Sequence, residues 1–215
     1  MGDKNHMKYD FEVGKENFKL SSVIESNQRE LVKVALDFVE KEGFKIKDNI
    51  LDLGSGDGWF QTIHPSAISV SANSEDIKQG EEKGFNMIFA DAHDLPFDKD
   101  MFDVVWARQC LEHFVSPYIA LKEIHRVLKD DGFAVIILPV PLNTLIFAKT
   151  HLYVMNDAMW INLFMKTGFN IEYAIKTKTA EIENTWDEYI FIIRRNKNEK
   201  ENEHHIDKQE HTVIS

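Results

Sequence analysis

The chain has 215 residues, of which 43% are hydrophobic and 28% are charged. This size and composition are typical of one globular domain, and they exclude a fully disordered or fibrous protein. Because 25 basic side chains stand against 36 acidic ones, the net charge is −11, and we expect no nucleic-acid partner, since phosphate backbones would be repelled.

Apolar runs alternate with amphipathic segments along most of the chain. Helices are predicted over residues 26–43, 74–84, 117–132 and 156–169, and strands over residues 49–53, 67–72, 86–92, 101–107, 133–141, 170–179 and 187–195. Gly132 is predicted to end the third helix. Strands that alternate with helices indicate an α/β fold with a parallel sheet covered on both faces. No helix separates the last two strands, so we expect a hairpin that contributes one antiparallel strand.

These elements divide the chain into three parts. Residues 1–22 are predicted to form a polar N-terminal arm, residues 23–195 one domain, and residues 196–215 a charged, disordered tail. The first residues lack the apolar core of a signal peptide, and the longest apolar stretch is shorter than the roughly 20 residues of a membrane span. The single cysteine, Cys110, can form no internal disulfide. We therefore expect a cytoplasmic protein with no membrane span.

A glycine-rich turn follows the first predicted strand. Gly54, Gly56 and Gly58 allow a sharp turn and let a ligand approach the backbone closely. A dinucleotide-binding fingerprint would have a glycine at Trp59, and a phosphate-binding P-loop would need a lysine followed by serine or threonine. Asp52 places a carboxylate two positions before the first glycine. This pattern favours a ligand that carries an amino-acid group.

Three segments together resemble a known family. LDLGSGDG (51–58), ADAHDLPFDKDMFDVV (90–105) and LEHFVSPYIALKEIHRVLKDDG (111–132) are similar, in order and spacing, to segments of class I S-adenosylmethionine-dependent methyltransferases of the small-molecule group. The resemblance covers residues 49–141. It implies a doubly wound, Rossmann-like sheet of strand order 3-2-1-4-5-7-6, S-adenosylmethionine as cofactor and S-adenosylhomocysteine as product.

The resemblance also implies roles for individual residues. The methionine portion of the cofactor would contact Asp52, Gly54, Ser55, Gly56 and Gly58. Asp91 would accept a hydrogen bond from the adenine amino group, with Ala92 beside the ring, and Gln109 would face the methionine portion or the substrate. The carboxyl ends of parallel strands, where open α/β sheets bind ligands, are the expected location of all these residues.

The chain departs from the family pattern near the second strand. The family places Asp or Glu at the end of this strand to bind the ribose hydroxyls, whereas this chain has Ala72 by alignment. Asn73 is therefore predicted to contact the ribose, although an uncharged amide makes weaker hydrogen bonds than a carboxylate. The helix after Gly58 also looks truncated before His64.

Residues for the methyl acceptor are less specifically indicated. His113, after the fourth strand, is predicted as a general base, with packing or capping as the alternative. His151 and Tyr153 lie in the connection to the last helix and are further catalytic candidates. Residues 142–165 are unusually apolar and would form a substrate wall, a homodimer contact or a helix packed on the sheet. No metal site is predicted, because His204, His205, Asp207 and His211 lie in the polar tail.

The sequence thus favours a methyltransferase that acts on a small-molecule or peptide-borne acceptor. Two alternatives remain open: a cofactor-binding protein of the same fold that has lost turnover, for which Ala72 argues, and a nicotinamide-dependent oxidoreductase, against which the missing glycine at Trp59 argues.

Overall fold

The computed structural model describes residues 25–47, 49–141, 148–177 and 188–196. Within them the strands form one sheet of order β3-β2-β1-β4-β5-β7-β6, as the sequence predicted. The strands are β1 (Ile50–Leu53), β2 (Ile68–Ser71), β3 (Met87–Phe89), β4 (Phe102–Arg108), β5 (Leu128–Pro139), β6 (Phe169–Thr177) and β7 (Glu188–Arg195). The expected hairpin is confirmed, because β7 pairs antiparallel with both β5 and β6.

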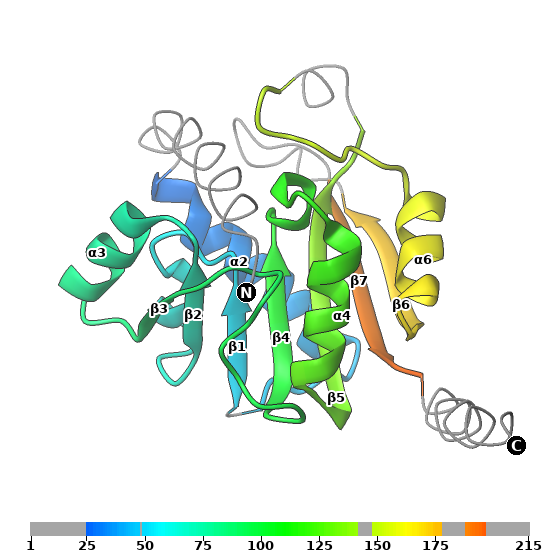
Figure 1. Cartoon of the computed structure of the whole chain (residues 1–215), viewed down its shortest axis with the longest axis horizontal. Helices are drawn as coiled ribbons and strands as arrows, with labels where there is room; N and C mark the ends of the chain where they lie inside the picture. The colour runs from blue at the N-terminus through cyan, green and yellow to red at the C-terminus, as the bar shows by residue number, and fades with distance from the viewer. Residues whose placement is uncertain (1–24, 48, 142–147, 178–187, 197–215) are drawn as a thin grey trace, which may run out of the picture.

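Helices cover both faces of this sheet (Figure 1). The α-helices are α2 (Glu25–Lys41), α3 (Ser74–Glu82), α4 (Pro117–Val127) and α6 (Asp157–Lys166), and the short 3-10 helices are η1 (Trp59–Thr62) and η2 (Leu111–His113). In Figure 1, α4 lies in front of the sheet and α2 behind it. No helix among the described residues is both long and apolar enough to cross a bilayer.

The sheet separates two hydrophobic cores. Along β4, Val104 and Trp106 join the core under α2, whereas Val105 and Ala107 join the core under α4 and α6. This alternation places apolar side chains on both faces of a central strand, as parallel sheets covered by helices require. Because β1 to β4 pair in parallel, their carboxyl ends all lie at the same edge of the sheet.

One predicted boundary is wrong. The helix expected over 117–132 ends at Val127, and residues from Leu128 onward already belong to β5, so Gly132 lies in a strand. A Cβ on Gly132 would come within 2.8 Å of the Asp103 carbonyl oxygen. This glycine is thus required for close strand packing and does not act as a helix stop.

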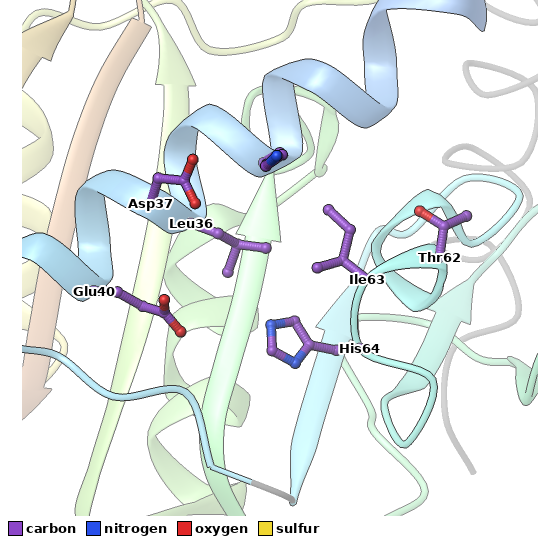
Figure 2. Close-up of a pocket in the computed structure, with 7 residues that line it drawn as sticks. Leu36, Asp37, Glu40, Thr62, Ile63 and His64 are labelled. Atoms are coloured by element: carbon purple, nitrogen blue, oxygen red, sulfur yellow. The ribbon is translucent and has the colours of Figure 1, made fainter.

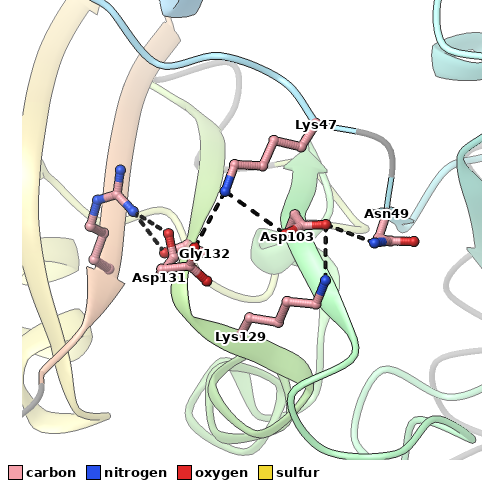
Figure 3. A network of polar contacts seen from close by, with 7 residues as sticks. Lys47, Asn49, Asp103, Lys129, Asp131 and Gly132 are labelled. Atoms are coloured by element: carbon pink, nitrogen blue, oxygen red, sulfur yellow. Dashed lines mark hydrogen bonds and ion pairs between the residues drawn. The ribbon is translucent and has the colours of Figure 1, made fainter.

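A charged network ties together the opposite edge of the sheet, where the strands begin (Figure 3). Asp103 accepts hydrogen bonds from Asn49 at 2.8 Å and from Lys129 at 3.0 Å. Lys47 links Asp103 to Asp131. Exposed ion pairs of this kind contribute little stability each, so we regard the network as fixing the chain entry into β1, β4 and β5.

The predicted terminal parts fall outside the described residues. This holds for the arm at 1–22 and for the tail from 197 onward. Asn196, the first residue of the predicted tail, donates a backbone hydrogen bond to the Gly168 carbonyl at 2.7 Å and so continues the pairing of the β6–β7 hairpin.

Candidate functional site

The glycine turn after β1 has the backbone conformation that its sequence predicts. Gly54, Gly56 and Gly58 have φ values of 66°, 55° and 87°, in the left-handed region that other residues rarely occupy. The Ser55 amide donates to the Val70 carbonyl at 3.0 Å, which fastens the turn to β2. The turn is therefore fixed to the sheet at its centre.

The surroundings of the three glycines differ. A Cβ on Gly54 would lie 2.4 Å from Cys110 Cβ, and one on Gly58 would lie 2.8 Å from the Phe85 ring. A Cβ on Gly56 would meet no atom of the described part of the chain within 4 Å. Gly54 and Gly58 thus allow close packing within the protein, whereas Gly56 presents bare backbone to open space, where a ligand could approach.

The helix that follows the turn is short. The sequence suggested a truncated helix, and η1 has only four residues of 3-10 type. A helix this short offers almost no macrodipole to an anionic group, so any ligand at this turn must be held mainly by the loop backbone and by side chains from neighbouring strands.

Asp52 lies below the glycine turn in a buried network. Its carboxylate accepts a hydrogen bond from Ser69 Oγ at 2.9 Å, and Gln61 Nε2 donates to that same hydroxyl at 2.7 Å. Burial raises the pKa of Asp52 to about 7, against a smaller opposing effect of the Ser69 hydrogen bond. The Ser69 hydroxyl thus holds the Asp52 side chain within the protein. The contact of Asp52 with the methionine portion stays a prediction.

The end of β2 carries a carboxylate that the sequence analysis missed. Ser71 Oγ donates to Asp76 Oδ2 at 2.9 Å, so the carboxylate of α3 lies directly beyond the last residue of the strand. Burial is the main cause that raises the pKa of Asp76 to about 6, and the nearby Asp57 and Glu75 act in the same direction. The signal that could have found it is an aspartate in the first turn of the helix after a strand-end serine.

Asn73, the predicted ribose contact, caps α3. Its Oδ1 accepts from the Glu75 amide at 3.0 Å, and its Nδ2 lies 3.4 Å from Asp76 Oδ1. The Asn73 oxygen is therefore already used by the N-cap hydrogen bond. If it turned to a ligand, an amide in the first turn of α3 would lose its partner. Asp76 is thus better placed than Asn73 to offer oxygen atoms at this point.

Asp91, the predicted adenine contact, follows β3 and is oriented by His93. Asp91 Oδ1 accepts from the His93 amide at 2.9 Å and lies 2.6 Å from His93 Nδ1. The Ser116 amide donates to His93 Nε2 at 3.1 Å, so Nδ1 carries the proton and donates it to Asp91. His93 therefore links this connection to the start of α4, a role that its sequence position did not reveal. Ala92 is buried beside it.

Gln109 follows β4 with a left-handed backbone, φ 51°. Its Nε2 donates to Glu188 Oε1 at 3.0 Å, and Arg108 donates to the same oxygen at 2.8 Å. The glutamine side chain is thus held toward β7 by a buried carboxylate, and its predicted contact with the methionine portion or substrate stays a prediction.

Two of the predicted catalytic side chains lie together. The rings of His113 and His151 are 4.8 Å apart, edge to face, and His113 Nε2 lies 3.8 Å from Glu112 Oε1. The backbone carbonyl of Glu112 accepts the amides of Leu152 and Tyr153, which docks this connection onto η2. Residues distant in sequence thus form one cluster beyond the end of β4.

Tyr153, the third catalytic candidate, has a structural partner. Its hydroxyl donates to the Val115 carbonyl at 3.0 Å, and its ring packs against the core under α4 and α6. This use of the hydroxyl proton favours an anchoring role over proton transfer.

The apolar connection around residues 142–165 is only partly described. Residues 142–147 lie outside the described residues. Trp160, on α6, is 1% exposed and stacks on Phe164. The α6 part of the segment is therefore a helix packed on the sheet; the substrate wall and the homodimer contact stay predictions.

A pocket of about 430 Å³ lies elsewhere, between α2 and the end of η1 (Figure 2). Leu36, Asp37 and Glu40 line it from α2, and His64 lines it from the opposite wall. Burial lowers the pKa of His64, against a smaller effect of Glu40. None of the predicted site residues lines this pocket, so it plays no part in the candidate site.

Comparison with known proteins gives a consistent result. Residues 51–136 match the model of a methyltransferase domain family. The chain is 34% identical over 129 residues to a demethylmenaquinone methyltransferase of Staphylococcus carnosus, covering 54% of this chain and 53% of that protein. It is 29% identical over 134 residues to 2-methyl-6-phytyl-1,4-hydroquinone methyltransferase 1 of Oryza sativa, covering 56% and 40%. The chain thus spans about half the length of these curated relatives, or less.

Solved structures share the fold. A chain in the complex of the Haloferax volcanii Trm112 methyltransferase activator with a methyltransferase superposes with a TM-score of 0.69 and 16% identity, covering 82% of this chain and 92% of that one. A methyltransferase from Thermotoga maritima gives 0.68 and 16% identity, covering 87% and 99%. At this identity the likeness establishes the architecture alone.

Proposed function

We propose that this chain is a class I S-adenosylmethionine-dependent methyltransferase that transfers a methyl group from S-adenosylmethionine to a small-molecule acceptor. The observation that carries the proposal is the glycine turn, in which Gly56 alone presents backbone to open space. When bound, the cofactor would supply a methyl group on a sulfonium. The lone pair of the acceptor would attack this methyl carbon in line, and the electrons of the broken carbon–sulfur bond would return to sulfur.

The residues of the turn and its neighbours fit this cofactor. The backbone of Gly54 to Gly58 would hold its methionine portion, and Asp91, oriented by His93, would accept from the adenine amino group. Because the leaving sulfide needs no proton, catalysis can rest largely on positioning, which supplies roughly 7–11 kcal/mol in well-oriented reactions. A rigid turn tied to β2 serves that purpose.

The ribose hydroxyls would be bound by Asp76. Its carboxylate lies 2.9 Å from the strand-end Ser71 hydroxyl, which supports a role for these two side chains in place of the family's strand-end acid. This assignment removes the main argument for a degenerate site, which rested on the missing acid at Ala72.

His113 would serve as general base for an acceptor hydroxyl or ammonium. Its Nδ1 lies 2.8 Å from the Thr150 carbonyl, which can only accept, so Nδ1 carries the proton and the lone pair lies on Nε2. A neutral imidazole with this tautomer can take a proton from an acceptor. Such a base could serve a small-molecule acceptor or a peptide-borne acceptor.

Ligand binding tests the proposal directly. At about 100 times its dissociation constant, S-adenosylhomocysteine should stabilise the protein by roughly 2.7 kcal/mol. For a chain of this size this means a rise in Tm of about 5–11 °C. NAD should cause no rise; a rise with NAD alone would favour the oxidoreductase. A new product one methyl heavier in a metabolite extract would establish turnover, whereas binding without such a product would favour the inactive cofactor-binding protein.

Gly56→Ala is expected to weaken S-adenosylhomocysteine binding at least tenfold, about 1.4 kcal/mol, without loss of the fold. The added methyl group meets none of the described residues and would project into the space assigned to the ligand. Gly84→Ala is the matched control, since Gly84 also has a left-handed backbone and open surroundings but lies between α3 and β3. Titration calorimetry on both variants should show a loss for Gly56→Ala only; equal affinities would contradict the placement of the cofactor.

Asp76→Asn is expected to weaken S-adenosylhomocysteine binding by roughly tenfold or more, since a hydrogen bond to a charged group contributes about 1.5–3 kcal/mol. Glu75→Gln removes the same charge from the adjacent, exposed position and should leave the affinity unchanged. The dissociation constants of both variants are measured by calorimetry. If the two substitutions have the same effect, general electrostatics and not a ribose contact explains it.

A further inference from the structure

The cluster beyond the end of β4 contains a carboxylate that makes no hydrogen bond to any of the described residues. The side chain of Glu112 is fully buried, and neither Oε1 nor Oε2 makes a hydrogen bond. A buried carboxylate is costly unless a proton or a cation compensates its charge.

Two imidazoles face this carboxylate. Glu112, His113 and His151 each offer one ligand atom, and these three atoms all lie within 4.8 Å of one another. One carboxylate and two imidazoles are a typical ligand set for zinc and related divalent transition metals, whereas calcium and magnesium prefer oxygen ligands alone. The side chains come from η2 and from the connection before α6, which the Glu112 carbonyl holds together.

The protonation of His113 suits metal binding. Because Nδ1 donates to the Thr150 carbonyl, the lone pair lies on Nε2, the atom 3.8 Å from Glu112 Oε1. Metal-binding histidines usually donate their other ring N–H to a backbone carbonyl or carboxylate, which fixes the ring and its tautomer. An imidazole nitrogen with a lone pair and a buried carboxylate oxygen thus lie 3.8 Å apart.

We propose that Glu112, His113 and His151 bind one divalent transition-metal ion, of the zinc type. Ligand atoms of a tetrahedral zinc site lie about 3.3 Å apart, given metal–ligand bonds of about 2.0–2.1 Å. The three side chains therefore need to close slightly around the ion. Arg108 does not oppose it strongly, because Glu188 pairs with this guanidinium at 2.8 Å. Three protein ligands leave a fourth position for an oxygen atom of a bound molecule.

The site lies among the residues assigned to the methyl acceptor, but the proposal does not depend on methyl transfer. A bound ion would occupy the His113 Nε2 lone pair, so His113 would serve as general base only in the metal-free protein. Glu112 and His113 lie far from His151 along the chain, so their positions in the sequence did not suggest them as one group of ligands. The only metal candidate considered from the sequence, the tail group of histidines, lies outside the described residues.

The test is metal binding by the full chain after treatment with a chelator. Zinc titrated by calorimetry should bind at one ion per chain, and cobalt as a substitute should give the visible bands of a low-symmetry site with nitrogen ligands. Glu112→Gln and His151→Ala should each weaken zinc binding at least tenfold. Zinc binding should persist in His64→Ala, two residues after the end of η1, and in a variant with His204, His205 and His211 all changed to alanine.

Stability measurements distinguish loss of the site from loss of the fold. Without metal, Glu112→Gln should be at least as stable as the unmodified chain, because the substitution removes a buried unpaired carboxyl. Zinc should raise the Tm of the unmodified chain but not of Glu112→Gln. Absence of zinc binding, or binding that disappears with the tail histidines, would overturn the proposal. S-adenosylhomocysteine binding in the same samples reports separately on the proposed function.

Discussion

Gly54→Ala is expected to destabilise the protein by roughly 2–5 kcal/mol, the sum of left-handed backbone strain and overpacking. The new Cβ would lie 2.4 Å from the Cβ of Cys110 and 3.0 Å from its Sγ. Cys110 is buried and its Sγ lies 3.4 Å from the Leu53 carbonyl, so neither partner can move without shifting the end of β1 or β4. The loss is measured by urea unfolding, which gives the free energy of unfolding directly.

The control for this prediction is again Gly84→Ala, which adds the same methyl group at φ 81° in open space. It should cost only the backbone strain, about 1–2 kcal/mol. The double variant Gly54→Ala/Cys110→Gly, which removes the opposing Cβ, should recover part of the loss. If Gly54→Ala and Gly84→Ala lose the same stability, close packing against Cys110 does not constrain the turn.

Asp52→Asn is expected to raise the stability of the protein above neutral pH by on the order of 4 kcal/mol. Burial raises the pKa of Asp52 in the folded protein to about 7, compared with 3.8 for an ordinary aspartate. The folded protein therefore holds a proton that the unfolded chain releases between about pH 4 and pH 7, so the stability contribution of Asp52 falls as pH rises through this range and is constant above it. Three pH units at about 1.4 kcal/mol each give the expected size.

The measurement is the free energy of unfolding of both proteins at several pH values between 4 and 8. Asparagine does not titrate, so the difference between variant and unmodified chain should grow from pH 4 to pH 7 and then level off. The difference is used because His125 titrates in the same range. Burial lowers the pKa of His125 in the folded protein to about 4, so its contribution to stability rises between about pH 4 and pH 6.5, opposite to that of Asp52. A difference that does not change with pH would show that Asp52 is ionised in the folded protein.

The local sequence predicted those features that depend on short-range chemistry. Left-handed turns require glycine, so the spacing of Gly54, Gly56 and Gly58 located the turn after β1 correctly. Apolar runs that alternate with amphipathic segments predicted the layered sheet, and the family resemblance supplied the strand order that the structure confirms. The error at Gly132 has a non-local cause, since the Asp103 carbonyl of the neighbouring strand excludes a side chain there.

Only the tertiary structure decided which polar groups compensate one another. The carboxylate of Asp76 reaches the end of β2 because α3 begins immediately after it, and His93 is oriented by both Asp91 and Ser116. His113 and His151 were separate candidates in the sequence, and the docking of residues 152 and 153 on the Glu112 carbonyl brings them together. Periodicity and motifs report the conformation of one segment at a time, whereas burial and charge compensation depend on segments distant in the sequence.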